Sequence, residues 1–234
     1  MAKPGYYPGF STLSQKEHWD GTTRALIEKR MASAGPLNFF SAVEAATMQA
    51  ILDCLIPQTD RDELHQIPVL HAVDDRLHEK RFDGYIYEGT LPEDESYRLG
   101  LSCIERVSQA RHRKPFSELD IASREDILIG LRDETLGSDW HGGRSLPAPH
   151  FWSLLLQDAI SAYYAHPFAW DEIGFGGPAY PRGYMRRVDG RPEPWEKDEV
   201  RYEWLAPEGS QSDSYKANEE LYSKSGHHGD EGSF

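Results

Sequence analysis

The chain has 234 residues with a formal net charge of −14 at pH 7, and 38% of its residues are hydrophobic. That composition can bury a sizeable core and suits one domain with extensions, or two small domains. The charge argues against a nucleic-acid or anionic-membrane surface, because phosphates attract lysine and arginine, and no apolar run is long enough to span a membrane.

The N-terminal region predicts an extended arm followed by a helix. Residues 1–12 are rich in glycine, proline and tyrosine, and they lack the basic region and apolar stretch of a secretory signal. A helix is expected from Ser14 to Ala34, where Gly35 and Pro36 would end it.

The clearest helix follows in the stretch SAVEAATMQAILDCLIP. Ser41 and Glu44 have the spacing of a capping box, in which each side chain satisfies a backbone N–H of the other residue. Pro57 would stop the helix. Helical spacing predicts one apolar face made of Val43, Ala46, Ala50, Ile51 and Leu55.

Two more helices are expected before residue 112. Pro68 suits the first turn of one of them, and the other would run to about Arg111. The predicted core positions are Val69, Leu70, Val73 and Leu77 in the first helix and Tyr97, Leu101, Ile104 and Val107 in the second.

An acidic cluster precedes the second of these helices. Acidic side chains favour a first helical turn because of the helix dipole, whereas a paired-carboxylate acid–base site would require burial. We therefore interpret the cluster as capping charge. It consists of Glu88, Glu93, Asp94 and Glu95.

The next helices are shorter at first and then strongly apolar. Residues 117–122 predict a short helical turn, and Ser123 with Asp126 would cap the helix after it. The stretch HFWSLLLQDAISAYYAHP is the last strong helix and would end before Pro167. In the helix capped by Ser123 and Asp126, the expected core positions are Ile127, Leu128 and Leu131.

The pattern as a whole predicts a mainly α protein: a compact helical domain, an extended N-terminal arm and a long irregular aromatic tail. We expect an arm and first helix over 1–38, a helical domain over 39–180 and a partner-wrapping acidic tail over 181–234. Residues 193–234 carry eleven acidic and four basic residues, a net charge of −7. The distal end has the composition of a disordered segment.

One helix face offers a candidate metal site. His71, Asp74, Asp75 and His78 lie at i, i+3, i+4 and i+7, so two imidazoles and a carboxylate could point the same way. The outer two residues, however, lie about 10 Å apart along the axis. We therefore interpret the four residues as a solvated polar face, with a metal site as the alternative.

Other residues of chemical interest admit simpler interpretations. His141, His150 and His166 flank the last helix and could be buried, contact a partner or act in catalysis, but no serine or cysteine nucleophile elbow lies nearby. Cys54 and Cys103 are expected to be free thiols packed as small apolar side chains, although the sequence leaves a disulfide open. The glycines of GFGGP follow a helix rather than a strand, which argues against a dinucleotide-binding loop.

An aromatic and arginine-rich segment follows the last helix. Such residues dominate interface hot spots, so the segment would be buried either against a partner or against its own domain. We predict a partner interface made of Trp170, Phe175, Tyr180, Arg182, Tyr184, Arg186, Arg187, Trp195, Tyr202 and Trp204.

Three motifs between about residues 39 and 180 resemble the gluconate 2-dehydrogenase subunit 3 family. The first is a helix end with a following turn, the second a helix with paired tyrosines, and the third a Trp–Gly–Pro closing motif. They are carried by Leu55, Ile56, Pro57, Thr59 and Asp60, then by Phe151, Leu154, Leu155, Tyr163, Tyr164 and Pro167, and then by Trp170, Ile173, Gly174, Phe175, Gly177 and Pro178.

The resemblance implies a non-catalytic small subunit in a hetero-oligomer. Its partner would be a large flavoprotein of the glucose-methanol-choline type, which holds FAD and oxidises a hydroxyl of a sugar or glycoside. The small subunit would help that partner to fold, stay in solution or reach its compartment, and would itself hold no cofactor, metal or catalytic residue.

The chain departs from many such relatives, which begin with a twin-arginine export signal. Arg186 and Arg187 are internal and followed by polar residues, so a cytoplasmic complex is expected rather than a periplasmic one. Two other functions stay open: a free-standing helical metal protein or enzyme that uses the His71–His78 face, and a transient assembly chaperone of the flavoprotein.

Overall fold

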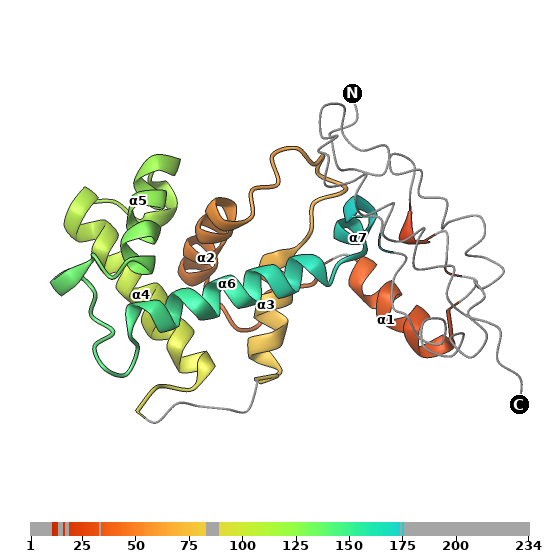
Figure 1. The fold of residues 1–234 in the computed structure, drawn as a ribbon, viewed down its shortest axis with the longest axis horizontal. Helices are drawn as coiled ribbons and strands as arrows, with labels where there is room; N and C mark the ends of the chain where they lie inside the picture. The colour runs from red at the N-terminus through yellow and green to blue at the C-terminus, as the bar shows by residue number, and fades with distance from the viewer. Residues whose placement is uncertain are drawn as a thin grey trace, which may run out of the picture. The chain divides into compact units, whose positions relative to one another are not determined.

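The computed structural model describes residues 11–13, 16, 19–32, 34–82, 89–173 and 175. Over these residues the chain forms helices and no strands, which confirms the mainly α prediction (Figure 1). By internal contacts the chain divides into two units, one of Leu26–Ala169 and one of Met1–Ala25 with Trp170–Phe234. The hydrophobic core lies in the first of them.

The first helix, α1, spans Gly21–Met31 and is shorter than the prediction from Ser14. Asp20 precedes it, and Oδ1 of Asp20 accepts a hydrogen bond from the N–H of Thr23 at 2.7 Å. This bond satisfies one of the backbone donors that a helix leaves unpaired in its first turn, so α1 begins there. It also lowers the pKa of Asp20. Residues 1–10 of the predicted arm lie outside the described residues.

The helix α2 spans Ala42–Leu55, and its predicted capping box is confirmed. The Ser41 N–H donates to Glu44 Oε2 at 2.9 Å, and the Glu44 N–H donates to Ser41 Oγ at 3.4 Å. The predicted apolar face is only partly right, because Val43 and Ala46 are exposed. Since α2 packs against α3, α4, α5 and α6, its buried surface is wider than one stripe. The buried positions are Ala45, Thr47, Met48, Ala50, Ile51 and Leu52.

The helices α3 (Val69–His78) and α4 (Glu93–His112) confirm the predicted core positions, all of which are buried. Pro68 sits at the N-cap of α3, one position before the first turn where it was expected. The acidic residues 93–95 do occupy the first turn of α4, as predicted. Glu88 lies outside the described residues.

A short 3₁₀ turn over Phe116–Glu118 leads into α5 (Ile121–Arg132). The predicted cap by Ser123 and Asp126 is wrong. Asp120 is the N-cap residue, and its Oδ1 accepts the N–H of Ser123 at 2.9 Å, so the serine lies in the first turn. The predicted core residues 127, 128 and 131 are buried.

The helix α6 spans Ala148–Tyr164 and ends before Pro167, as expected. It packs against α2, α3, α4 and α5, and Figure 1 shows it crossing the layer formed by these helices. The sequence predicted irregular structure from Pro167 onward, but this residue begins a further helix, α7 (Pro167–Ile173). Proline suits the first helical position because its fixed φ matches the helix and its missing N–H has no partner there anyway.

Two hydrogen bonds join the N-terminal segment to α7 and to Phe175, which follows it. The Thr12 N–H donates to Asp171 Oδ1 at 2.6 Å, and Thr12 Oγ1 donates to the carbonyl of Phe175 at 3.0 Å. Both bonds lie within the smaller unit. Among the described helices, none combines the length and apolar character that crossing a membrane requires.

Candidate functional site

The structure separates the residues of the candidate metal face. Asp74 is 1% exposed, so the expected solvated face is wrong for this residue. Its carboxylate accepts three backbone N–H groups: Asn38 at 2.6 Å, Phe39 at 3.1 Å and Phe40 at 2.8 Å. Those bonds hold the connection before α2 and leave the carboxylate turned away from its neighbours on α3.

The other three residues of that face do not converge. His71 is half-buried, whereas Asp75 and His78 are exposed. Within the part of the chain that the structure describes, no three His, Cys, Asp or Glu side chains are placed to hold a metal ion.

The histidines that flank α6 and the two cysteines show no sign of a reactive site. His141 is exposed, His150 is half-buried, and His166 is buried with its Nδ1 accepting the N–H of Phe168 at 3.2 Å. Cys54 and Cys103 are free thiols, as expected. Burial raises the pKa of both, which disfavours the thiolate that reactive cysteines use.

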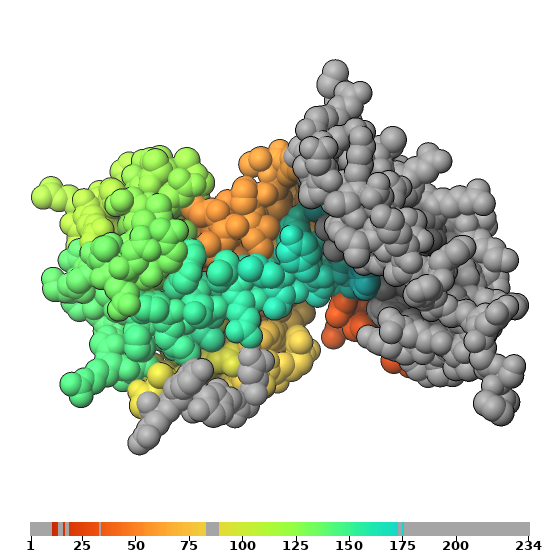
Figure 2. Space-filling view, in the orientation of Figure 1, coloured from red at the N-terminus to blue at the C-terminus, as the bar shows by residue number. Residues whose placement is uncertain are grey.

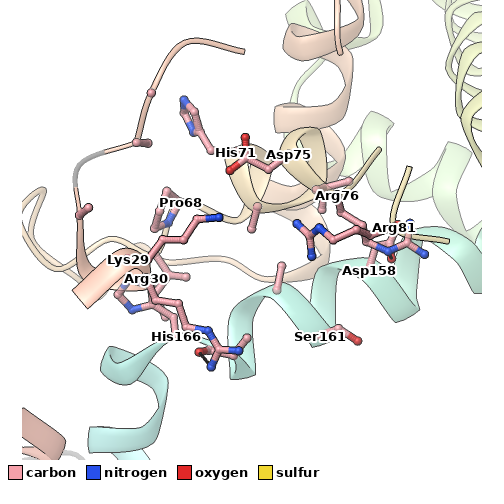
Figure 3. Close-up of a pocket in the computed structure, with 18 of the residues that line it drawn as sticks. Lys29, Arg30, Pro68, His71, Asp75, Arg76, Arg81, Asp158, Ser161 and His166 are labelled. Carbon is pink, nitrogen blue, oxygen red and sulfur yellow. Dashed lines mark hydrogen bonds and ion pairs between the residues drawn. The ribbon is translucent and has the colours of Figure 1, made fainter. Parts of the chain in front are cut away.

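A cavity of about 620 Å³ opens between the second half of α1, α3 and α6 (Figure 3). Four basic side chains and three carboxylates line it, together with two histidines. Several of these charges pair within the wall: Arg81 Nε lies 2.6 Å from Glu79 Oε2. The charged lining residues are Lys29, Arg30, Asp75, Arg76, Glu79, Arg81 and Asp158. This near balance of charge argues against a dedicated anion site in the cavity.

A buried polar network lies beneath one wall of this cavity and joins three helices. Tyr97 of α4 donates its hydroxyl to Asp158 Oδ2 of α6 at 2.6 Å. Arg76 of α3 lies with Nε 3.4 Å from Asp158 Oδ1 and pairs through Nη2 with Glu93. Burial, and next the charge of Asp158, raise the pKa of Tyr97 well above its ordinary value. The phenol therefore stays protonated and acts as a fixed donor.

The loop after α2 and the end of α6 meet in an arginine–aromatic junction, which we define as Arg61, His65, Tyr163, His166 and Phe168. Arg61 Nη2 donates to Tyr163 Oη at 3.1 Å and to the carbonyl of Phe168 at 3.4 Å. The guanidinium carbon also lies 5.6 Å from the centroid of the tyrosine ring, within cation–π range. The rings of His65 and His166 lie 5.1 and 4.9 Å from that of Phe168.

The outward side of α6 carries a row of apolar side chains, which we call the α6 face. The buried side of the helix holds Phe151, Leu155 and Ala159. On the other side, Ile160 is 43% exposed and Tyr164 is 51% exposed. The half-buried residues Trp152 and Leu156 precede Ile160 at intervals of four, and Tyr164 follows it at the same interval, so all four lie on one helical face. The α6 face consists of Trp152, Leu156, Ile160, Tyr163 and Tyr164, of which Trp152 and Tyr163 also pack in part against the core.

The junction and the α6 face are continuous, because Tyr163 belongs to both. The ring of Tyr163 meets that of Tyr164 edge to face, with centroids 5.2 Å apart. Figure 2 shows α6 running along the face of the molecule turned toward the viewer. Aromatic, arginine and apolar side chains in one half-exposed area are typical of a protein–protein interface.

Two of the ten predicted interface residues lie in the described part of the chain. Trp170 is 5% exposed, and Phe175 is 43% exposed, with their ring centroids 5.4 Å apart in an edge-to-face contact. The eight others, from Tyr180 to Trp204, lie outside the described residues, as do Gly174, Gly176 and Gly177. Their role stays a prediction.

The paired tyrosines are predicted from the sequence only as part of a family motif, and Arg61 and Ile160 are not predicted as site residues. A signal was available: Asp158 is the sole Asp, Glu, Lys or Arg among the 17 residues of α6. A helix with an apolar stripe on one side normally carries charge on the other.

Comparison with known proteins gives a family and nothing closer. No curated protein and no solved structure matches the chain. A family model described as gluconate 2-dehydrogenase subunit 3 matches residues 42–177. The match runs from the start of α2 past the end of α7, so it includes the junction and the α6 face. It also covers the three motifs on which the resemblance depended, except for Pro178 at the end of the third. Because the match spans more than half of the chain, the chain belongs to the gluconate 2-dehydrogenase subunit 3 family.

Proposed function

We propose that this protein is the non-catalytic small subunit of a hetero-oligomeric dehydrogenase. Membership of a family of dehydrogenase subunits implies a dehydrogenase partner. In this proposal the partner is a large flavoprotein of the glucose-methanol-choline type, which holds FAD and oxidises a hydroxyl of a sugar or glycoside. The complex would be cytoplasmic.

The observation that carries the proposal is that side chains in and next to the family motifs hold helices together. The arginine–aromatic junction ties the turn of the first motif to the paired tyrosines of the second through Arg61 and Tyr163. Gln58, inside the first motif, closes the same loop by exchanging two hydrogen bonds with the backbone of Ile67 at 3.0 and 2.7 Å. These side chains brace helices instead of gathering around a reacting group, which supports a structural subunit.

The flavin belongs to the partner in this proposal. Dinucleotide sites are built where a parallel strand meets a helix N-terminus, and the described residues form helices only. When bound, the flavin would accept the hydride released by the oxidised hydroxyl. This chain would cover apolar surface of the large subunit, and a permanent pair of that kind buries about 2,000 Å² or more.

Co-expression with a large flavoprotein of the glucose-methanol-choline type from the same organism tests the proposal. We expect a tagged form of this chain to retain the flavoprotein in a fixed ratio through size-exclusion chromatography, with a flavin absorbance spectrum in the complex. The flavoprotein expressed alone would be insoluble or inactive. A flavoprotein that is fully active as a monomer would refute the proposal, and a small chain lost on maturation would indicate an assembly chaperone.

A further inference from the structure

We propose that the α6 face is the docking surface for the large subunit, and that its occupant is an apolar, uncharged surface of that flavoprotein. This inference rests on the proposed function. It names the part of the small chain that would form the centre of the interface.

The distribution of charge singles out α6. Each of the helices α1 to α5 exposes at least one charged side chain, whereas the single charged residue of α6, Asp158, is buried. In a chain of net charge −14, an uncharged outward face is the exception. The exposed charges on the other helices include Lys29, Asp53, Asp75, Arg98 and Glu125.

The buried Asp158 explains why the face is fixed in its orientation. Its carboxylate is held by the Tyr97 hydroxyl and lies beside Arg76, so rotation of α6 about its axis would break a buried network. Ile160 and Tyr164, on the opposite side of the helix, are therefore kept outward although their side chains are largely apolar. Another surface that removes such exposed apolar side chains from water lowers the free energy of the system, so association is favoured.

The composition of the face matches the centre of an interface rather than its rim. Interface centres are depleted in charge and enriched in aromatic residues, and arginine is frequent among hot spots. The α6 face supplies a tryptophan and two tyrosines, and Arg61 stands at its C-terminal end over Tyr163. A complementary partner surface must lack unpaired charge, because a charge buried there would lose its hydration.

The α6 face is smaller than a standard protein–protein interface. A helix of 17 residues is about 25 Å long and about 10 Å across, so one side of it covers less than the roughly 800 Å² that each partner contributes to a standard interface. The α6 face would thus be the centre of a larger contact.

Three variants on the face and one control variant elsewhere test this docking surface, and all four are compared with wild type after co-expression with the flavoprotein. Ile160→Asp and Ile160→Arg place opposite charges on the face, and we expect each to lower the flavin retained per mole of tagged small chain at least tenfold. Ile129→Asp on α5 is the matched control, since Ile129 is 46% exposed, and it should retain the wild-type amount. Tyr164→Asp is a second probe of the face.

The outcomes separate this inference from the proposed function. If wild type retains no flavoprotein, the proposed function fails. If wild type retains it and the Ile160 and Tyr164 variants retain the same amount, the docking inference alone is wrong. A wild-type small chain that forms a homodimer dissociated by Ile160→Asp would also overturn it, because the occupant would then be a second copy. Far-UV circular dichroism and the thermal midpoint of each variant check that the fold is kept.

Discussion

Asp74 shows how one buried carboxylate can organise a connection. Three consecutive backbone N–H groups, from Asn38 to Phe40, point at its two oxygens. They precede the first turn of α2, so α3 holds the entry to α2 through a single side chain. A buried N–H that loses its acceptor costs about 1–3 kcal/mol, which makes this residue sensitive to truncation.

We predict that Asp74→Ala lowers the free energy of unfolding by about 3 kcal/mol, because it leaves the buried N–H of Phe40 and the part-buried N–H groups of Asn38 and Phe39 without their acceptor. Urea denaturation followed by circular dichroism measures the loss. Asp75→Ala is the neighbouring control on the exposed side of α3 and should change the stability by less than about 0.5 kcal/mol. Equal losses in the two variants would contradict this role of Asp74.

Tyr97 links stability to alkaline pH. Its hydroxyl is fully buried and donates to Asp158, and burial followed by that carboxylate raises its pKa well above the ordinary value of about 10. The folded state therefore keeps the proton at a pH where the unfolded state releases it. The stabilisation is complete below the unfolded pKa and is lost as pH rises through the folded pKa.

We expect the free energy of unfolding to fall above about pH 10 by up to about 1.4 kcal/mol per pH unit from this group. Tyr97→Phe removes the ionisable group, so the decline with pH should be shallower in the variant, while its stability at neutral pH is about 1–3 kcal/mol lower. Urea titrations at several alkaline pH values give both quantities. Tyr164→Phe, at an exposed position, should keep the wild-type slope; identical slopes in all three proteins would refute the assignment.

At the scale of whole helices, the contact between α4 and α6 depends on a missing side chain. A Cβ atom on Gly100 would come within 2.3 Å of the Phe151 ring, closer than real Cβ contacts. That ring is fully buried and lies with its centroid 5.8 Å from Tyr97 and 5.9 Å from Trp140, so it has little room to move. The glycine thus sets how closely the two helices approach.

We predict that Gly100→Ala destabilises the protein by about 1–3 kcal/mol, although alanine alone would favour the helix by about 1 kcal/mol. The overlap with Phe151 must outweigh the helix preference because both neighbours of the ring are fixed. Thermal and urea unfolding test the sign. Gly35→Ala is the control, since no atom lies within 4 Å of its added Cβ, and it should be neutral or slightly stabilising. A stabilised Gly100→Ala variant would show that the helices can separate at no cost.

At the scale of the whole molecule, stability and partner binding are expected to depend on different parts of the chain. The buried core cluster runs from Phe40 to Ala169, within the larger unit. The acidic tail over 181–234 lies in the other unit and contains seven of the ten predicted interface residues. Removing that region should therefore affect assembly more than folding.

We predict that deletion of residues 181–234 leaves the thermal midpoint of the chain within a few degrees of wild type, because the core cluster is intact. The same deletion should reduce the flavoprotein retained after co-expression at least tenfold, because the tail contains most of the predicted interface residues. Differential scanning calorimetry and flavin absorbance measure the two effects. A truncated chain with full retention would assign the whole interface to the helical unit.

The sequence by itself determined the helical class and most of the core. Periodic apolar residues in α3 and α4 predicted every buried position named there, because 3.6-residue periodicity is a local property. The capping box at Ser41 was also readable, since both partners lie within one turn. The family could be recognised from three short motifs, and the match over 42–177 agrees with them.

Tertiary structure decided what periodicity cannot encode. Asp74 looked like one of four polar residues on a solvated face, and only the path of residues 38–40 makes it a buried acceptor. The burial of α2 was misjudged for the same reason, because several helices surround it. Likewise, α6 shows an apolar outward face only once Asp158 is seen to turn inward toward Tyr97 and Arg76. Which side of a helix meets water depends on the neighbours that cover it, and those neighbours come from distant parts of the chain.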